Sequence, residues 1–184
     1  MAKIGTRTGL VALSLGIVAS LVLLFYGPSQ GSGTFQTLTL LVSLGVMFYA
    51  SHPLGHLLVG QALGVSTDHF FLGRSDFRKL KQAPLSSVGN LMPTIGTKLN
   101  RPRLQSLSPR RRGWVFGAGV IVSNSLIVLQ MLYAVAAGYA TLALAVGGLF
   151  VAATLLTEAM FSTEVGDLAK MRRQLRTPSS APSG

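Results

Sequence analysis

Four long apolar runs are the feature that most restricts what this chain can form. The first, residues 9–26, has 18 residues without a charged side chain, close to the ~20 that an α-helix needs to cross a membrane. The others cover residues 35–63, 114–137 and 140–161. Charged residues make up only 11% of the chain, well below the ~25% of soluble domains. We therefore expect an all-α polytopic membrane protein, with residues 1–184 forming one domain of four transmembrane helices.

The first run has two interpretations, a retained span and a cleaved signal peptide. It follows Lys3 and Arg7 and is longer than the ~7–15-residue core of a signal peptide, and no clean small-x-small cleavage site comes after it. We expect a retained span.

The segment between the second and third runs, residues 64–113, is polar and basic. Two of its stretches, Val65 to Leu72 and Val88 to Thr97, contain β-type residues and are bounded by Gly or Pro. We expect a small β-sheet or hairpin there, lying at the membrane surface. The end of the chain, residues 177–184, has the composition of a disordered tail.

The positive charges predict the orientation. With four spans, all 16 Lys and Arg residues fall on one side of the membrane: Lys3 and Arg7, ten in the central segment and four in the tail, residues 162–184. Because cytoplasmic segments carry the excess of Lys and Arg, we expect both termini and the central segment in the cytoplasm. The net charge of +11 therefore indicates topology and contact with anionic lipid rather than nucleic-acid binding.

Two histidines, His52 and His56, lie four residues apart inside the second run. On a helix this spacing places both imidazoles on one face, which suits a single metal ion better than haem, whose two axial ligands come from opposite faces. The chain has no cysteine, so further ligands must be histidine or carboxylate. The alternative is structural, with a histidine hydrogen-bonded to Asn124 or to a backbone carbonyl of a neighbouring helix.

Three segments occur in order along the chain: His52-Pro-Leu-Gly-His56, Gly117-Ala-Gly-Val-Ile-Val-Ser-Asn124 and Gly166-Asp167. Together they resemble the site-2 protease family of intramembrane zinc metalloproteases. That family has His-Glu-x-x-His in the first segment, an Ala-Gly-Pro motif in the second and an Asp-Gly motif in the third. The resemblance covers residues 35–174.

The resemblance implies that His52, His56 and Asp167 bind zinc, with water in the fourth position, and that the partner or substrate is a transmembrane protein or peptide segment. Two departures bear on activity. Pro53 occupies the position of the glutamate that transfers protons, a contribution worth ~10²–10⁴-fold. Gly166 also precedes Asp167 instead of following it, and the family's Asn-x-x-Pro is absent.

Asp167 has two interpretations. A straight helix from Ala140 would carry it roughly 40 Å, past a ~30 Å hydrocarbon core and past the histidines. Either the chain breaks near Ser162, Thr163 and Gly166 and turns back to bring Asp167 to the metal, or Asp167 is solvated and begins an amphipathic cytoplasmic helix.

Three functions are compatible with these residues. The first is a zinc-binding site-2-protease-like protein that is impaired in peptide hydrolysis and binds transmembrane partners. The second is an active intramembrane zinc protease with a non-standard base, for which Glu158 and Glu164 are the only candidates near the cytoplasmic end of the fourth run. The third is a structural membrane protein without metal.

Overall fold

The computed structural model describes residues 2–29, 31–74, 93–161 and 166–176. The prediction for residues 177–184 and the first part of the second predicted strand lie outside these ranges. In chain order the elements are β1 (Ala2–Ile4), α1 (Thr6–Tyr26), the short 3-10 helix η1 (Gly27–Ser29), α2 (Gly33–Ala62), β2 (Thr67–Arg74), β3 (Pro93–Leu99), α4 (Arg101–Ser106), α5 (Pro109–Ala136), α6 (Thr141–Phe161) and α7 (Asp167–Arg176).

Four of these helices are long and apolar enough to cross a membrane. They are α1, α2, α5 and α6, in the four positions predicted from the apolar runs. Helix α5 begins at Pro109 rather than at residue 114, because proline is favourable in the first helical position, where it leaves no backbone N–H unpaired. The chain is therefore mostly helical with one small sheet, as expected for the fold class.

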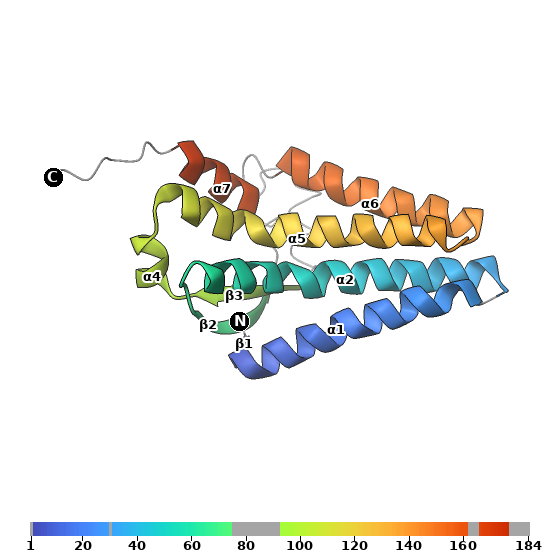
Figure 1. Cartoon of the computed structure of the whole chain (residues 1–184), viewed down its shortest axis with the longest axis horizontal. Coiled ribbons are helices and arrows are strands. Elements are labelled where there is room, and N and C mark those ends of the chain that lie inside the picture. The colour runs from blue at the N-terminus through green and yellow to red at the C-terminus, as the bar shows by residue number, and fades with distance from the viewer. Residues whose placement is uncertain (1, 30, 75–92, 162–165, 177–184) are drawn as a thin grey trace.

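Helix α2 is the centre of the bundle. It packs against α1, α5 and α6, and α5 also packs against α6 and α7. Figure 1 shows the turns that join α1 to α2 and α5 to α6 at one end of the bundle, and the sheet, α4 and α7 at the other. The elements that carry the positive charges therefore share one end.

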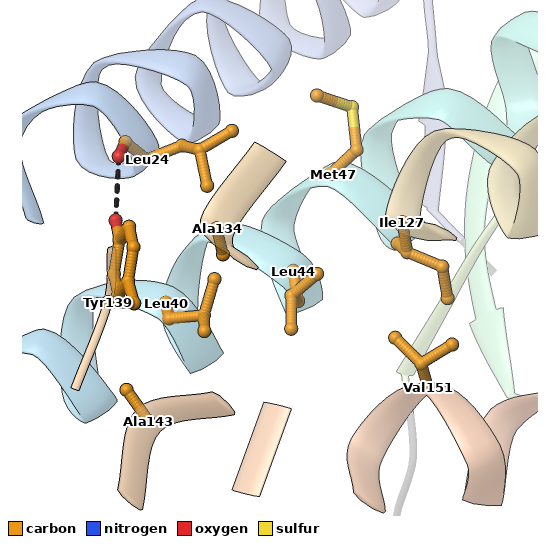
Figure 2. Close-up of a cluster of buried hydrophobic side chains, with 9 residues drawn as sticks. All are labelled: Leu24, Leu40, Leu44, Met47, Ile127, Ala134, Tyr139, Ala143 and Val151. Atoms are coloured by element: carbon orange, nitrogen blue, oxygen red, sulfur yellow. Dashed lines mark hydrogen bonds between the residues drawn. The ribbon is translucent and has the colours of Figure 1, made fainter. Parts of the chain in front are cut away.

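An apolar core joins the helices toward the end with the two turns (Figure 2). Leu40 and Leu44 of α2 and Ile127 of α5 are completely buried in it. Beside them the hydroxyl of Tyr139 donates a 2.6 Å hydrogen bond to the carbonyl of Leu24, which ties the α5–α6 turn to the end of α1. In contrast, α1 and α6 expose most of their apolar side chains, as expected of helices that face lipid.

A buried polar cluster holds α1 to α2 and α5. The hydroxyls of Ser20 and Ser43 each donate to the other residue's backbone carbonyl at 2.8 Å. The amide of Gln130 donates to both hydroxyls, at 2.8 Å to Ser20 and 3.2 Å to Ser43. Such bonds between membrane helices contribute about 0.6–2 kcal/mol each, so this cluster specifies which faces of the three helices meet.

The small sheet differs from the prediction in its strand count. It has three antiparallel strands in the order β1-β2-β3, whereas only the last two were expected. Ala2 pairs with Leu72 and Ile4 with Phe70, so the residues before the first span complete the sheet. Three residues next to a membrane span carry too little pattern to be recognised as a strand. On the other side, the hydroxyl of Thr97 in β3 donates to the carbonyl of Pro53, which places the sheet against α2 beside the histidines.

Candidate metal centre

Helix α2 presents both histidines to the same carboxylate oxygen. The Nε2 atoms of His52 and His56 lie 3.2 Å and 3.1 Å from Oδ2 of Asp167. These three atoms all lie within 4.8 Å of one another, and the group could hold a metal ion. We call them the His/His/Asp site. They are the three ligands that the family resemblance implies.

Asp167 reaches the histidines because the chain turns back after α6. Helix α6 ends at Phe161, and Gly166 adopts a left-handed backbone with φ of 96° immediately before α7 begins at Asp167. Glycine accommodates this conformation without strain. Asp167 does begin an amphipathic helix, as one alternative expected, but only 21% of its side chain is exposed and it faces the histidines. Of the residues expected to permit the break, Ser162 and Thr163 lie outside the described part of the chain.

Glycines let α5 approach the site closely. A methyl group at Gly119 would overlap Nε2 of His56 and lie 2.9 Å from Nε2 of His52. A methyl group at Gly55 of α2 would meet the carbonyl of Ala118 at 2.7 Å. The two imidazoles therefore lie directly against the backbone of α5, where any larger residue would displace them.

The other ring nitrogen of each histidine faces a hydrogen-bond acceptor. Nδ1 of His56 lies 2.8 Å from the backbone carbonyl of Val115. Because a carbonyl only accepts, Nδ1 must carry the hydrogen. Nδ1 of His52 lies 3.5 Å from the hydroxyl of Ser123, which can accept from the ring when it donates to the carbonyl of Val120 at 3.3 Å. Partners of this kind orient metal-bound histidines and select the tautomer that points Nε2 at the metal.

Asn124 does not contact the histidines. Its side-chain amide donates to the carbonyl of Val120 in its own helix at 2.9 Å, and its buried Oδ1 has no hydrogen-bond partner among the described residues. The alternative in which Asn124 binds a histidine is therefore wrong, while a backbone carbonyl does serve His56.

Asp167 is ionised at neutral pH. Burial raises the pKa of its carboxyl, but hydrogen bonds from His52 and His56 and the charges of His56 and Lys170 outweigh this and hold the pKa well below its usual range. The ammonium of Lys170 lies 2.9 Å from Oδ1. One carboxylate oxygen is thus held by the lysine, and the other is directed at the two imidazoles.

The separations suit a tetrahedral metal ion. Zinc bound to nitrogen and oxygen at its usual bond lengths holds two ligand atoms about 3.3–3.4 Å apart. The two histidine–aspartate separations, 3.2 Å and 3.1 Å, are slightly shorter, and the two imidazole nitrogens lie within 4.8 Å of each other, so modest side-chain shifts would bring all three to bonding distance. The residues present therefore fit a divalent ion with three protein ligands.

Of the two candidate bases, Glu158 and Glu164, the structure describes only the first. Glu158 is half-buried on α6, close enough to Asp167 for their negative charges to repel, but it is not part of the His/His/Asp site. Glu164 lies outside the described residues. Pro53 occupies the position of the family's glutamate within α2 and offers the site no proton-transfer group. No general base is therefore in place among the described residues.

Four further residues support the site, and none of them was predicted from the sequence to do so. They are Val115, Ser123, Gly119 and Lys170. Gly119 and Ser123 belong to the motif of residues 117–124, which is the one signal that could have pointed to them. Val115 acts through its backbone carbonyl, so its side chain carries no signal at all.

Comparisons with protein-family models, with curated proteins and with solved structures found no match to this chain.

Proposed function

We propose that this protein is a multi-pass membrane protein of the site-2-protease type that binds zinc through His52, His56 and Asp167. One observation carries the proposal. The Nε2 atoms of both histidines and Oδ2 of Asp167 meet at about hydrogen-bond distance, yet the hydrogen of His56 is engaged at Val115 and that of His52 at Ser123. When both imidazoles are neutral, three acceptors face one another there, and a single divalent ion satisfies all three at once. In the metal-free protein a proton on Nε2 takes that place and bonds to Asp167.

The chain's own residues predict a low rate of peptide hydrolysis. Zinc with three protein ligands supplies a Lewis acid that lowers the pKa of water to about 7. His52, His56 and Asp167 would hold the ion, and Val115 and Ser123 would orient the two imidazoles. No described side chain of the site both accepts a proton and delivers it to a leaving amine, because the position that would do so is a proline. This omission forfeits about 10²–10⁴-fold in rate.

The partner we propose is a transmembrane segment of another protein. The site is built from α2, a helix of the bundle, and α7, and His56 lies six residues before the end of α2 at Ala62, about 9 Å from that end at 1.5 Å per residue. Ionisable residues at such a depth are costly and are retained for function. A segment held beside the His/His/Asp site would be bound rather than rapidly cut.

The proposed orientation places both termini in the cytoplasm. It rests on the shared end in Figure 1, where β1, α4 and α7 all lie, together with the positive-inside rule. Reporter fusions at residue 1 and after residue 184, compared with a reporter in the turn near Gly138, test this orientation directly. Equal labelling of all three from outside the cell would contradict it.

The experiment that tests the metal is elemental analysis of the purified protein, covering all first-row transition metals. We expect about one zinc ion per chain, lost in His56→Ala and in Asp167→Ala. The third histidine provides a matched control, because His69 lies in β2 and is not part of the His/His/Asp site. His69→Ala should keep the metal. Metal-free wild-type protein, or equal loss in all three variants, would favour the structural alternative.

The second candidate is an active protease that uses Glu158. Glu158 is half-buried near the end of α6 and close enough to Asp167 for their charges to interact. Rapid cleavage of a membrane-segment substrate that is abolished by Glu158→Gln would favour this candidate. Slow or absent cleavage in protein that contains zinc favours the impaired form.

A further inference from the structure

Helix α7 runs from the metal centre back toward the membrane surface along α5. Asp167, its first residue, meets the histidines beside Gly119. A methyl group at Gly117 would overlap the sulfur of Met171, and one at Gly113 would lie 3.3 Å from Leu175. Successive turns of α7 thus pass Gly119, Gly117 and Gly113 in order, which takes its last turn to the beginning of α5.

The beginning of α5 marks the level of the lipid headgroups. Trp114, next to Gly113, is 48% exposed, and tryptophan is enriched where a span meets the membrane interface. The three arginines that precede it, Arg110 to Arg112, are typical of the same level. The last turn of α7 is therefore also at headgroup depth.

The second half of α7 carries exposed cations. Arg176 lies in the last turn and Arg172 lies one turn before it on the same face, and both are exposed. Neither forms an ion pair with any residue in the described ranges. Lys170, by contrast, is engaged with Asp167 at 2.9 Å. Guanidinium groups that have no carboxylate partner among the described residues, at or one turn from headgroup depth, fit the phosphates of anionic lipids.

We propose that Arg172 and Arg176 bind anionic headgroups of the adjacent leaflet and that this contact holds α7 on α5 with Asp167 in the metal centre. The proposal rests on the proposed metal site, and it adds a partner and a coupling that the ligands alone do not imply. The lipid binds at one end of a ten-residue helix, and the metal ligand is at the other.

The direction of the coupling between lipid and metal follows from where the apolar side chains of α7 lie. Ala169 is buried, Met171 lies against Gly117, and Leu175 lies against Gly113 with 47% of its surface still exposed. A released α7 would offer the membrane few apolar residues and no aromatic one, which is too little for strong interfacial binding. Lipid therefore favours the docked helix. Because linkage is reciprocal, anionic lipid should raise the affinity for metal by the same factor by which metal raises the affinity for lipid.

The test compares full-length protein in nanodiscs of zwitterionic lipid with protein in nanodiscs that also contain phosphatidylglycerol. Zinc affinity is measured by competition with a chromophoric chelator, and docking of α7 by hydrogen exchange of its amides, with and without zinc. The variant is Arg172→Gln/Arg176→Gln. The control is Arg101→Gln/Arg103→Gln, which removes the same charge from two exposed residues of α4.

We expect phosphatidylglycerol to raise zinc affinity about fivefold or more in wild type and in the α4 control, and to protect the α7 amides even without zinc. Both effects should vanish in Arg172→Gln/Arg176→Gln. An equal gain in zinc affinity in all three proteins would mean that the anionic surface merely concentrates zinc, and it would overturn the proposal. Weaker zinc affinity or faster exchange of the α7 amides in phosphatidylglycerol would overturn it as well. If zinc fails to bind in either membrane, the proposed function fails, and the exchange of the α7 amides still decides the lipid contact.

Discussion

Nδ1 of His56 on α2 donates a 2.8 Å hydrogen bond to the backbone carbonyl of Val115 on α5. This contact joins the two central helices and also assigns the tautomer of the neutral imidazole, in which the lone pair lies on Nε2, the atom that faces Asp167. The same arrangement recurs more weakly at His52, where Ser123 takes the place of the carbonyl. The helix packing therefore directs both Nε2 atoms at Asp167, which is the arrangement that a metal ion at this group would need.

The close approach of α5 predicts that Gly119→Ala weakens metal binding. The added methyl group would overlap Nε2 of His56, so one imidazole must move. We expect at least a tenfold loss of zinc affinity, within the range found when the groups that orient metal ligands are altered. Gly45→Ala is the matched control, because a methyl group there meets nothing within 4 Å. Unchanged affinity in Gly119→Ala would contradict the site geometry.

Restoring a carboxylate next to the first histidine should raise peptidase activity. Pro53→Glu supplies a proton-transfer group at the position where the family has one, and it also removes a proline from the interior of α2. We expect cleavage of a membrane-segment substrate to rise by about 10²-fold or more. Pro53→Gln has a side chain of the same shape as glutamate that cannot act as a base, so it should cleave the substrate at the wild-type rate. Equal rates in both variants would show that the proline does not limit hydrolysis.

The docking of α7 should resist mild acid in metal-free protein. The pKa of Asp167 is depressed, so the stability contributed by its ionised form is present above the ordinary value of about 3.9 and is lost only as the pH falls through the lower folded value. We expect equal hydrogen-exchange protection of α7 at pH 7 and pH 5. Asp167→Asn should exchange faster at both values. Zinc, in contrast, should be released on acidification, because protons compete for the ligand atoms.

The buried cluster of Ser20, Ser43 and Gln130 should contribute measurably to the stability of the bundle. Gln130→Leu removes two interhelical hydrogen bonds at nearly constant volume, and we expect the free energy of unfolding to fall by about 1 kcal/mol. Unfolding by sodium dodecyl sulfate in mixed micelles measures it. Leu129→Ala, at a neighbouring exposed position, should change it by less than about 0.5 kcal/mol. A comparable loss in both variants would assign the effect to helix propensity.

Sequence alone determined the membrane helices and the histidine pair. Apolar length predicts a span because the hydrocarbon layer has a nearly constant thickness, and i, i+4 spacing predicts a shared face because the helical repeat is constant. Both are local properties of the chain. The resemblance to the site-2 proteases also depended on local motifs, and it named the three residues that the fold brings together.

Only the tertiary structure decided what surrounds His52 and His56. Asp167 lies 111 residues after His56, and its place depends on the turn at Gly166 and on the packing of α7 against α5. The roles of Val115 and Gly119 arise from how closely two helices approach, and the strand at Ala2 exists because β2 lies beside it. These features depend on contacts between distant segments, which no local periodicity records. The histidine pair could be predicted from the sequence, whereas the orientation of the imidazole nitrogens depended on the packing of α5 against α2.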